Sequence, residues 1–128
     1  DRREDVKNNI TPSLSANKVV LLDRYYYSTA AYQGALGLDP DSILRENENF
    51  APVPDRAYIF TAPPEECLAR IESSRGSHSS FEKLEYLKQV QKIFDSFQGT
   101  NIKKIKSSGT IEDIHTQLCE DVHQLIES

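Results

Sequence analysis

Three short runs of apolar and β-branched residues stand out in the pattern of hydrophobic and polar positions. They cover residues 18–22, 57–61 and 102–106, and runs of this length and composition are typical of β-strands. The first two runs are mostly apolar rather than alternating, which indicates parallel strands that are covered on both faces. We therefore predict a parallel sheet built from these three runs.

The segments around these runs carry apolar residues three or four positions apart, the spacing of amphipathic helices. Val6, Ile10 and Leu14 follow this spacing near the N-terminus, where Pro12 is expected to bend or end the helix. Further helices are predicted over residues 25–36 and 81–97, from Asp39 to about residue 49, from Pro63 onward, and after the capping box of Thr110 and Asp113.

The predicted helices alternate with the predicted strands, so we expect an α/β fold with right-handed crossovers. Three strands form a small sheet relative to the number of predicted helices. Ligands in such folds bind beyond the carboxyl ends of the strands. The loops at that edge are therefore where we expect the chemistry.

Composition and charge narrow the class of protein. The chain has 128 residues, which fits one domain, and a net charge of −5. This charge argues against a nucleic-acid or membrane binder, so an anionic substrate would need a local basic site. No apolar run approaches the roughly 20 residues of a membrane helix, and the charged N-terminus does not resemble a signal peptide. Cys67 and Cys119 have no metal or redox spacing, which favours reduced thiols in a cytosolic protein.

An acid and a base follow the first predicted strand directly, at Asp23 and Arg24. The planar guanidinium of an arginine matches the oxygens of a phosphate. Asp23 could orient that guanidinium or hold a metal-bound water. The alternative is a structural ion pair that caps the strand. The three tyrosines that follow point in different directions on a helix, so we interpret them mainly as packing residues.

Two further features are ambiguous when taken singly. Gln33 offers both a donor and an acceptor to the edge of a base, or is simply a solvated side chain. The segment 70–82 is rich in serine and glycine and carries Arg70 and Arg75. It could close over phosphates as a lid, or it could be a flexible connection between helices. No role is assigned to the three histidines.

Taken together, these passages resemble one family. The sequence DRYYYSTAAYQGA, residues 23–35, resembles the signature of thymidylate kinases, which read DR[YF], then Ser, then AYQG after a hydrophobic strand. The passages DRREDV, PVPDRAYIFTAPPEECLARI and FEKLEYLKQVQKIF resemble the neighbouring parts of the same family. The likeness spans nearly all of the chain.

The resemblance implies a fold and an activity. The fold would be that of P-loop nucleoside-monophosphate kinases, a three-layer α/β/α arrangement around a parallel sheet. The activity would be transfer of the ATP γ-phosphoryl group to dTMP, giving dTDP, with Mg²⁺ as the metal. The resemblance also implies a cytoplasmic homodimer.

The resemblance also implies roles for the charged residues. Arg24 would grip the phosphate of dTMP, and Asp23 would sit at the reacting phosphates and reach the magnesium ion through water. Arg75 would be a catalytic arginine of the lid. Arg70 would lie near the adenine of ATP.

The remaining roles concern the acceptor nucleoside. Arg2 would contact the nucleotide at the thymine end. Ser28, Thr29 and Gln33 would line the base pocket. Tyr32 would pack on the deoxyribose and disfavour a 2′-hydroxyl group.

The sequence departs from the family pattern in several places. It contains no GxxxxGK[ST] phosphate loop and no methionine, it has Ser80 where the family lid commonly has arginine, and it has Thr61 where aspartate is common. We therefore expect residues 1–128 to be the C-terminal three-fifths of one domain, without its first strand and P-loop. Its acceptor site would lie in 1–50 and its lid in about 70–82, and the segment alone would be inactive. The alternatives are a non-catalytic nucleotide-binding or pseudokinase module, and a kinase for another deoxynucleoside monophosphate.

Overall fold

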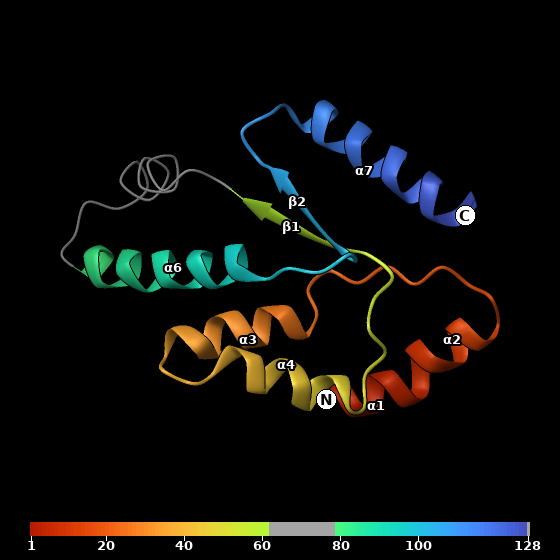
Figure 1. Ribbon diagram of the computed structural model, residues 1–128, viewed down its shortest axis with the longest axis horizontal. Coiled ribbons are helices and arrows are strands. Elements are labelled where there is room, and N and C mark those ends of the chain that lie inside the picture. Colours follow the sequence, from red (N-terminus) through yellow and green to blue (C-terminus); the bar gives the residue numbers. More distant parts are fainter. Residues whose placement is uncertain (62–78, 128) are drawn as a thin grey trace. The chain divides into compact units, whose positions relative to one another are not determined.

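The computed structural model describes residues 1–61 and 79–127, the latter without the side chains of residues 79–81 (Figure 1). The chain divides into two compact units, Asp1–Pro54 and Asp55–Ser128, and each is described by itself. The helix predicted from Pro63, together with Cys67, Arg70 and Arg75, lies outside the described residues.

The first unit begins with a helix of three consecutive parts: α1 (Arg2–Asp5), the π-helical η1 (Val6–Ile10) and α2 (Thr11–Ser15). The π turn is closed by the N–H of Thr11, which donates to the carbonyl oxygen of Val6. Pro12 lies in the first turn of α2, where a missing N–H is tolerated. The helix therefore continues past the proline rather than ending there. Val6 and Ile10 are buried as predicted, whereas Leu14 is 41% exposed.

Helices α3 (Tyr26–Ala35) and α4 (Pro40–Glu48) confirm the predictions for these segments and pack against each other (Figure 1). The side chain of Asp39 caps α4 by accepting the N–H of Asp41 at 3.2 Å. Gly37 turns the chain between the two helices with φ of 107°, a conformation that favours glycine. The buried side chains of the pair are those of Tyr26, Tyr27, Ala30, Ala31, Ile43 and Asn47.

The predicted strand over residues 18–22 is wrong. This segment has no regular secondary structure, and Val19 and Leu21 are 64% and 82% exposed. A strand forms only when its backbone pairs with a neighbouring strand, and none of the described residues pairs with this segment. Asp23 and Arg24 therefore follow an exposed irregular segment and not a buried strand.

The second unit holds the predicted parallel pairing. Strands β1 (Ala57–Thr61) and β2 (Ile102–Lys106) lie side by side in parallel, with Ile59 opposite Lys104 (Figure 1). The chain between them includes α6 (Ser79–Ser96), which contacts β1. Ile59 and Ile105 are buried, but Phe60 is 48% exposed. Within the described residues, β1 is therefore not covered on both faces as predicted.

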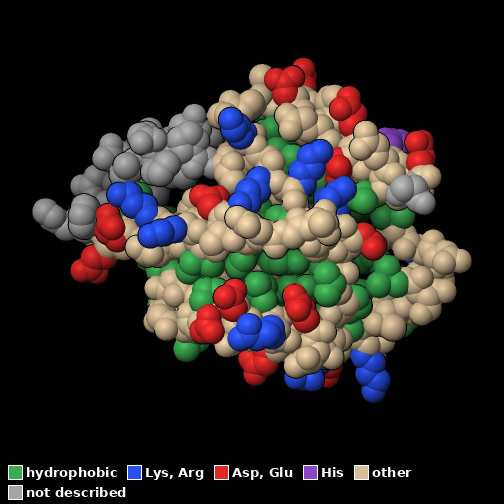
Figure 2. Space-filling model, in the orientation of Figure 1, with side chains coloured by type: hydrophobic (Ala, Val, Ile, Leu, Met, Phe, Trp, Pro, Cys, Tyr) green, Lys and Arg blue, Asp and Glu red, His purple; other side chains and the backbone are tan. Residues whose placement is uncertain are grey.

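The last element is α7 (Ile111–Glu127), which begins where the capping box predicted. The hydroxyl oxygen of Thr110 accepts the N–H of Asp113 at 3.1 Å. Across the described part of the chain, no helix combines the length and the apolar character needed to cross a bilayer. Figure 2 shows acidic and basic side chains interspersed with apolar ones on the visible face.

Candidate functional site

One helix of the first unit carries four of the predicted ligand residues. Ser28, Thr29, Tyr32 and Gln33 all belong to α3. At 100° per residue their spacing covers a sector of about 140° on the helix surface. The first three are half-buried and Gln33 is exposed. They therefore share one side of α3, and none is sealed inside the core.

Arg2 meets this helix from the N-terminal segment. Its Nη2 donates to Oγ1 of Thr29 at 2.9 Å, and its Nη1 donates to Oδ1 of Asn47 at 2.7 Å. The guanidinium carbon also lies 5.9 Å from the centre of the Tyr25 ring. The structure thus brings together two predicted residues, Arg2 and Thr29, that are 27 positions apart in the sequence.

Asn47 was not predicted from the sequence as part of this cluster. It lies on α4 and is 8% exposed. The sequence does contain a feature that could have identified Asn47. It follows the buried Ile43 by four positions, so it lies on the apolar face of its helix. A polar side chain on such a face needs a hydrogen-bond partner, and Arg2 is that partner.

Arg24 and Tyr32 form a second contact between predicted residues. The guanidinium carbon of Arg24 lies 5.6 Å from the centre of the Tyr32 ring, within the range of a cation–π interaction. Arg24 has a φ of 71°, in the left-handed region that disfavours residues other than glycine. Strained backbone of this kind is concentrated at functional sites.

Asp23 is exposed and makes no hydrogen bond or ion pair with any residue that the structure describes. The alternative of a structural Asp23–Arg24 ion pair is therefore wrong. The described residues also contain no group of three or more His, Cys, Asp or Glu side chains able to hold a metal. A single free carboxylate fits Mg²⁺, which keeps several waters and needs only one or two protein oxygens.

The three tyrosines that follow Arg24 pack as predicted. The rings of Tyr25 and Tyr26 are 4.5 Å apart, and those of Tyr26 and Tyr27 are 4.7 Å apart. The hydroxyl of Tyr25 donates to the carbonyl oxygen of Pro52 at 3.0 Å. Burial raises the pKa of both Tyr25 and Tyr26. The buried hydroxyl of Tyr26 has no hydrogen-bond partner among the described residues.

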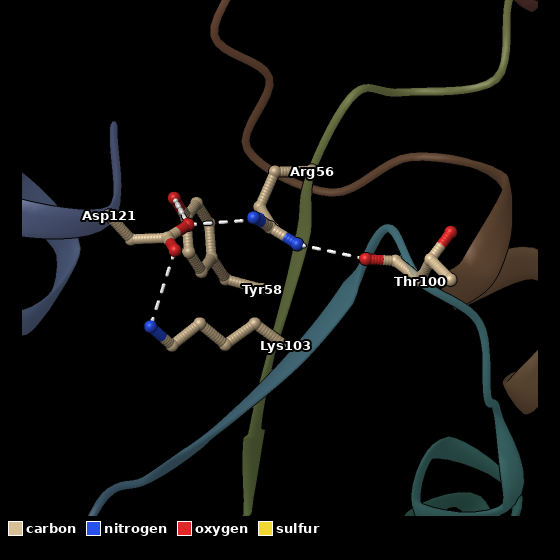
Figure 3. Close-up of polar contacts among 5 residues, drawn as sticks. All are labelled: Arg56, Tyr58, Thr100, Lys103 and Asp121. Atoms are coloured by element: carbon tan, nitrogen blue, oxygen red, sulfur yellow. Dashed lines mark hydrogen bonds and ion pairs between the residues drawn. The ribbon is translucent and has the colours of Figure 1, made fainter. Parts of the chain in front are cut away.

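The second unit contains a polar cluster that was not predicted from the sequence (Figure 3). The buried carboxylate of Asp121 on α7 accepts hydrogen bonds from Arg56 Nε at 2.9 Å, Tyr58 Oη at 2.5 Å and Lys103 Nζ at 3.3 Å. Arg56 also donates from Nη1 to the carbonyl oxygen of Thr100 at 3.0 Å. The sequence feature that could have predicted this cluster is the same as for Asn47: Asp121 is a polar residue on the apolar face of its helix.

The pKa shifts in this cluster indicate that the hydrogen bonds stabilise the ionised form of Asp121. The hydrogen bond from Tyr58, together with Lys103 and Arg56, holds the pKa of Asp121 below its ordinary value despite burial. Burial and the bond to Asp121 raise the pKa of Tyr58 to about 12. The cluster joins α7 to the amino-terminal parts of β1 and β2, opposite the strand ends where ligands bind. We therefore assign it to stability.

Helix α7 also carries Cys119, for which a reduced thiol was predicted, and two of the histidines. Cys119 is free and half-buried, and its Sγ lies 3.4 Å from Nε2 of His115. His115 and His123 are exposed.

Comparison with known proteins gives one consistent result. A family model described as thymidylate kinase matches residues 1–118. A thymidylate kinase of Desulfotalea psychrophila is 46% identical over 127 residues, which cover 98% of this chain and 62% of that protein. A probable thymidylate kinase of Archaeoglobus fulgidus is 38% identical over 128 residues, covering 100% of this chain and 63% of that protein. The chain thus spans about three-fifths of the length of these relatives.

Proposed function

The chain belongs to the thymidylate kinase family, and on this premise we propose that the complete protein transfers the γ-phosphoryl group of ATP to dTMP, giving dTDP. The observation that carries the proposal is the family match over residues 1–118, which includes every predicted site residue. The proposed domain has the P-loop nucleoside-monophosphate-kinase fold, with its acceptor site in residues 1–50 and its lid in about 70–82.

The contacts of the first unit support an acceptor site for the nucleoside. A guanidinium only donates hydrogen bonds, whereas the carbonyl oxygens of thymine only accept them, so Arg2 suits the thymine end. Thr29 accepts from Arg2 and keeps its own hydroxyl proton for a ligand. Ser28 and Gln33 line the same pocket, and Tyr32 packs on the deoxyribose.

Arg24 binds the phosphate of dTMP in this proposal. An oxygen of that phosphate attacks the γ-phosphorus of ATP, the bond to the β-phosphate oxygen breaks, and ADP leaves. The nucleophile is already an anion, so no protein base is required, and catalysis consists of positioning and charge neutralisation. Mg²⁺, when bound, neutralises charge on the phosphates, and Asp23 would hold it through water. Arg75 acts from the lid and Arg70 lies near the adenine.

The proposal also includes a cytoplasmic homodimer. Light scattering coupled to size-exclusion chromatography measures the mass of the purified protein in solution. A mass of two subunits is expected, and a monomer would contradict this part of the proposal. Fractionation of cells that express the complete gene tests the location.

The test of function uses the protein expressed from the complete gene. ADP release is followed with ATP, Mg²⁺ and one of three acceptors, dTMP, dUMP or dCMP. The proposal predicts the highest kcat/KM for dTMP. Equal rates with dCMP would contradict the acceptor, and nucleotide binding without transfer would favour a non-catalytic module. The 128-residue chain by itself should form no dTDP, since it contains no GxxxxGK[ST] sequence to bind the ATP phosphates.

A further inference from the structure

The Arg2 guanidinium is held from two sides by side chains of different helices. Asn47 on α4 accepts from Nη1 at 2.7 Å, and Thr29 on α3 accepts from Nη2 at 2.9 Å. An arginine side chain is otherwise long and flexible, and fixing it before a ligand arrives removes part of the entropic cost of binding. No other described residue accepts from Arg2, so three of its five N–H groups remain for a ligand.

Asn47 is itself fixed in a single orientation. Its Nδ2 donates to the carbonyl oxygen of Ile43, one helical turn earlier, at 2.9 Å. The two hydrogen bonds need opposite ends of the amide, because a guanidinium only donates and a carbonyl only accepts. The side chain is 8% exposed, so water does not compete effectively for its oxygen. The amide therefore presents a fixed acceptor to Arg2.

We propose that Asn47 is a positioning residue for the acceptor nucleotide: it holds the Arg2 guanidinium where the thymine end of dTMP binds. This inference rests on the proposed function and adds a residue to it. Asn47 acts through Arg2 and does not itself touch the nucleotide. Its loss should weaken dTMP binding and leave the chemical step unchanged, because the base is remote from the transferred phosphoryl group.

A purely structural tie between α1 and α4 would give a different result. It would change stability, and any loss of activity would follow the loss of folded protein. Positioning predicts instead a change in KM with kcat preserved. It also predicts that Asn47 loses its influence on KM once Arg2 is absent, since the effects of coupled residues are not additive.

The experiment compares four variants of the complete protein: Asn47→Leu, Asn47→Asp, Arg2→Ala and the double variant of Arg2→Ala with Asn47→Leu. KM and kcat for dTMP are measured beside the unfolding temperature. Asn47→Leu removes the acceptor and should raise KM about tenfold with kcat within about twofold. Asn47→Asp keeps an oxygen for Arg2 and should keep KM near the wild-type value. It should still lower the unfolding temperature, because a carboxylate oxygen then faces the Ile43 carbonyl.

The matched control is Ile43→Ala, which removes a buried side chain one turn away and leaves the backbone carbonyl that Asn47 uses. It should lower the unfolding temperature without changing KM. In the Arg2→Ala background, Asn47→Leu should have no further effect on KM. An unchanged KM in Asn47→Leu, or additive effects in the double variant, would overturn the inference while leaving wild-type dTMP kinase activity intact. A wild-type protein that forms no dTDP would overturn the proposed function as well.

Discussion

The guanidinium carbon of Arg24 lies 5.6 Å from the centre of the Tyr32 ring. Attraction between the cation and the face of the ring holds a flexible, exposed side chain close to α3. The two residues have different proposed partners, the phosphate for Arg24 and the deoxyribose for Tyr32. If these roles hold, the contact would bring the two proposed subsites next to each other, as the covalent structure of a nucleotide requires.

Arg24→Ala should lower kcat/KM for dTMP by a factor of roughly 100 to 1,000, the usual effect of losing a donor to a charged transition state. Arg24→Lys should also be poor, because an ammonium group cannot bind two phosphate oxygens in the planar geometry of a guanidinium. Steady-state kinetics of the complete protein measures both. Arg3→Ala is the control, since Arg3 also stacks on a ring, that of Phe50 at 4.1 Å, and has no proposed role. A change of only a few-fold in Arg24→Ala would show that the phosphate role is wrong.

The backbone of Arg24 predicts that glycine at this position is more stable than alanine, although both lose activity. A φ of 71° is unfavourable for arginine and acceptable for glycine. Arg24→Gly should therefore be about 0.5–1 kcal/mol more stable than Arg24→Ala, which loses the same contact with Tyr32, after the greater chain entropy of unfolded glycine is subtracted. It should lose as much activity as Arg24→Ala. Chemical denaturation gives the free energy of unfolding.

Asn17 provides the control for this prediction. It has a φ of 59°, but asparagine tolerates this region better than arginine does. Asn17→Gly should change both the stability and kcat/KM little. A stability of Arg24→Gly equal to or below that of Arg24→Ala would mean that the native backbone at Arg24 carries no strain that glycine relieves.

Tyr25 and Tyr26 should respond oppositely to the loss of their hydroxyl groups. Tyr25→Phe removes the hydrogen bond to the Pro52 carbonyl and should destabilise the protein by about 1 kcal/mol. Tyr26→Phe removes a buried hydroxyl that has no partner among the described residues, and should be neutral or stabilising by up to about 1 kcal/mol. Denaturant midpoints at constant m-value measure both. Equal destabilisation by the two changes would indicate that the Tyr26 hydroxyl has a partner in solution.

Asp121→Asn should destabilise the protein at neutral pH and matter less in acid. Its hydrogen bonds keep the folded pKa below the ordinary value of 3.8, so the native state binds protons less tightly than the unfolded state. The resulting stability is fully present above about pH 4 and is lost as the pH falls through the lower, folded pKa. Thermal unfolding of wild type and variant between pH 2.5 and 7 should therefore show two curves that converge in acid.

Glu120→Gln is the control for this experiment, because Glu120 is an exposed acid next to Asp121 on α7. It should change the unfolding temperature little at any pH. A constant difference between wild type and Asp121→Asn over the whole range would mean that the charge of Asp121 does not contribute to stability.

Local sequence signals were sufficient to predict helices α3, α4, α6 and α7. Asp39 caps α4 through the N–H of Asp41, and Thr110 caps α7 through that of Asp113. Each contact joins residues two or three positions apart, so composition and spacing determine it without reference to the rest of the fold. The placement of Ser28, Thr29, Tyr32 and Gln33 on one side of α3 follows from helical periodicity in the same way.

Which of the apolar runs form strands could not be predicted from local sequence alone. Apolar runs marked residues 18–22 and β1 equally, yet only β1 forms a strand, because β2 lies beside it and supplies the hydrogen bonds. A run of residues determines the tendency to form a strand. Whether the strand exists depends on a partner that is distant in the sequence.

By itself, the sequence determined the family, helices α3, α4, α6 and α7, and the residue types of the candidate site. Only the tertiary structure decided that Arg2 binds Asn47, that Arg24 lies over Tyr32, and that Asp121 receives three donors. Periodicity tells which face a side chain occupies on its own element. It does not tell which face of another element packs against it, because that depends on the sum of many weak contacts over the whole core.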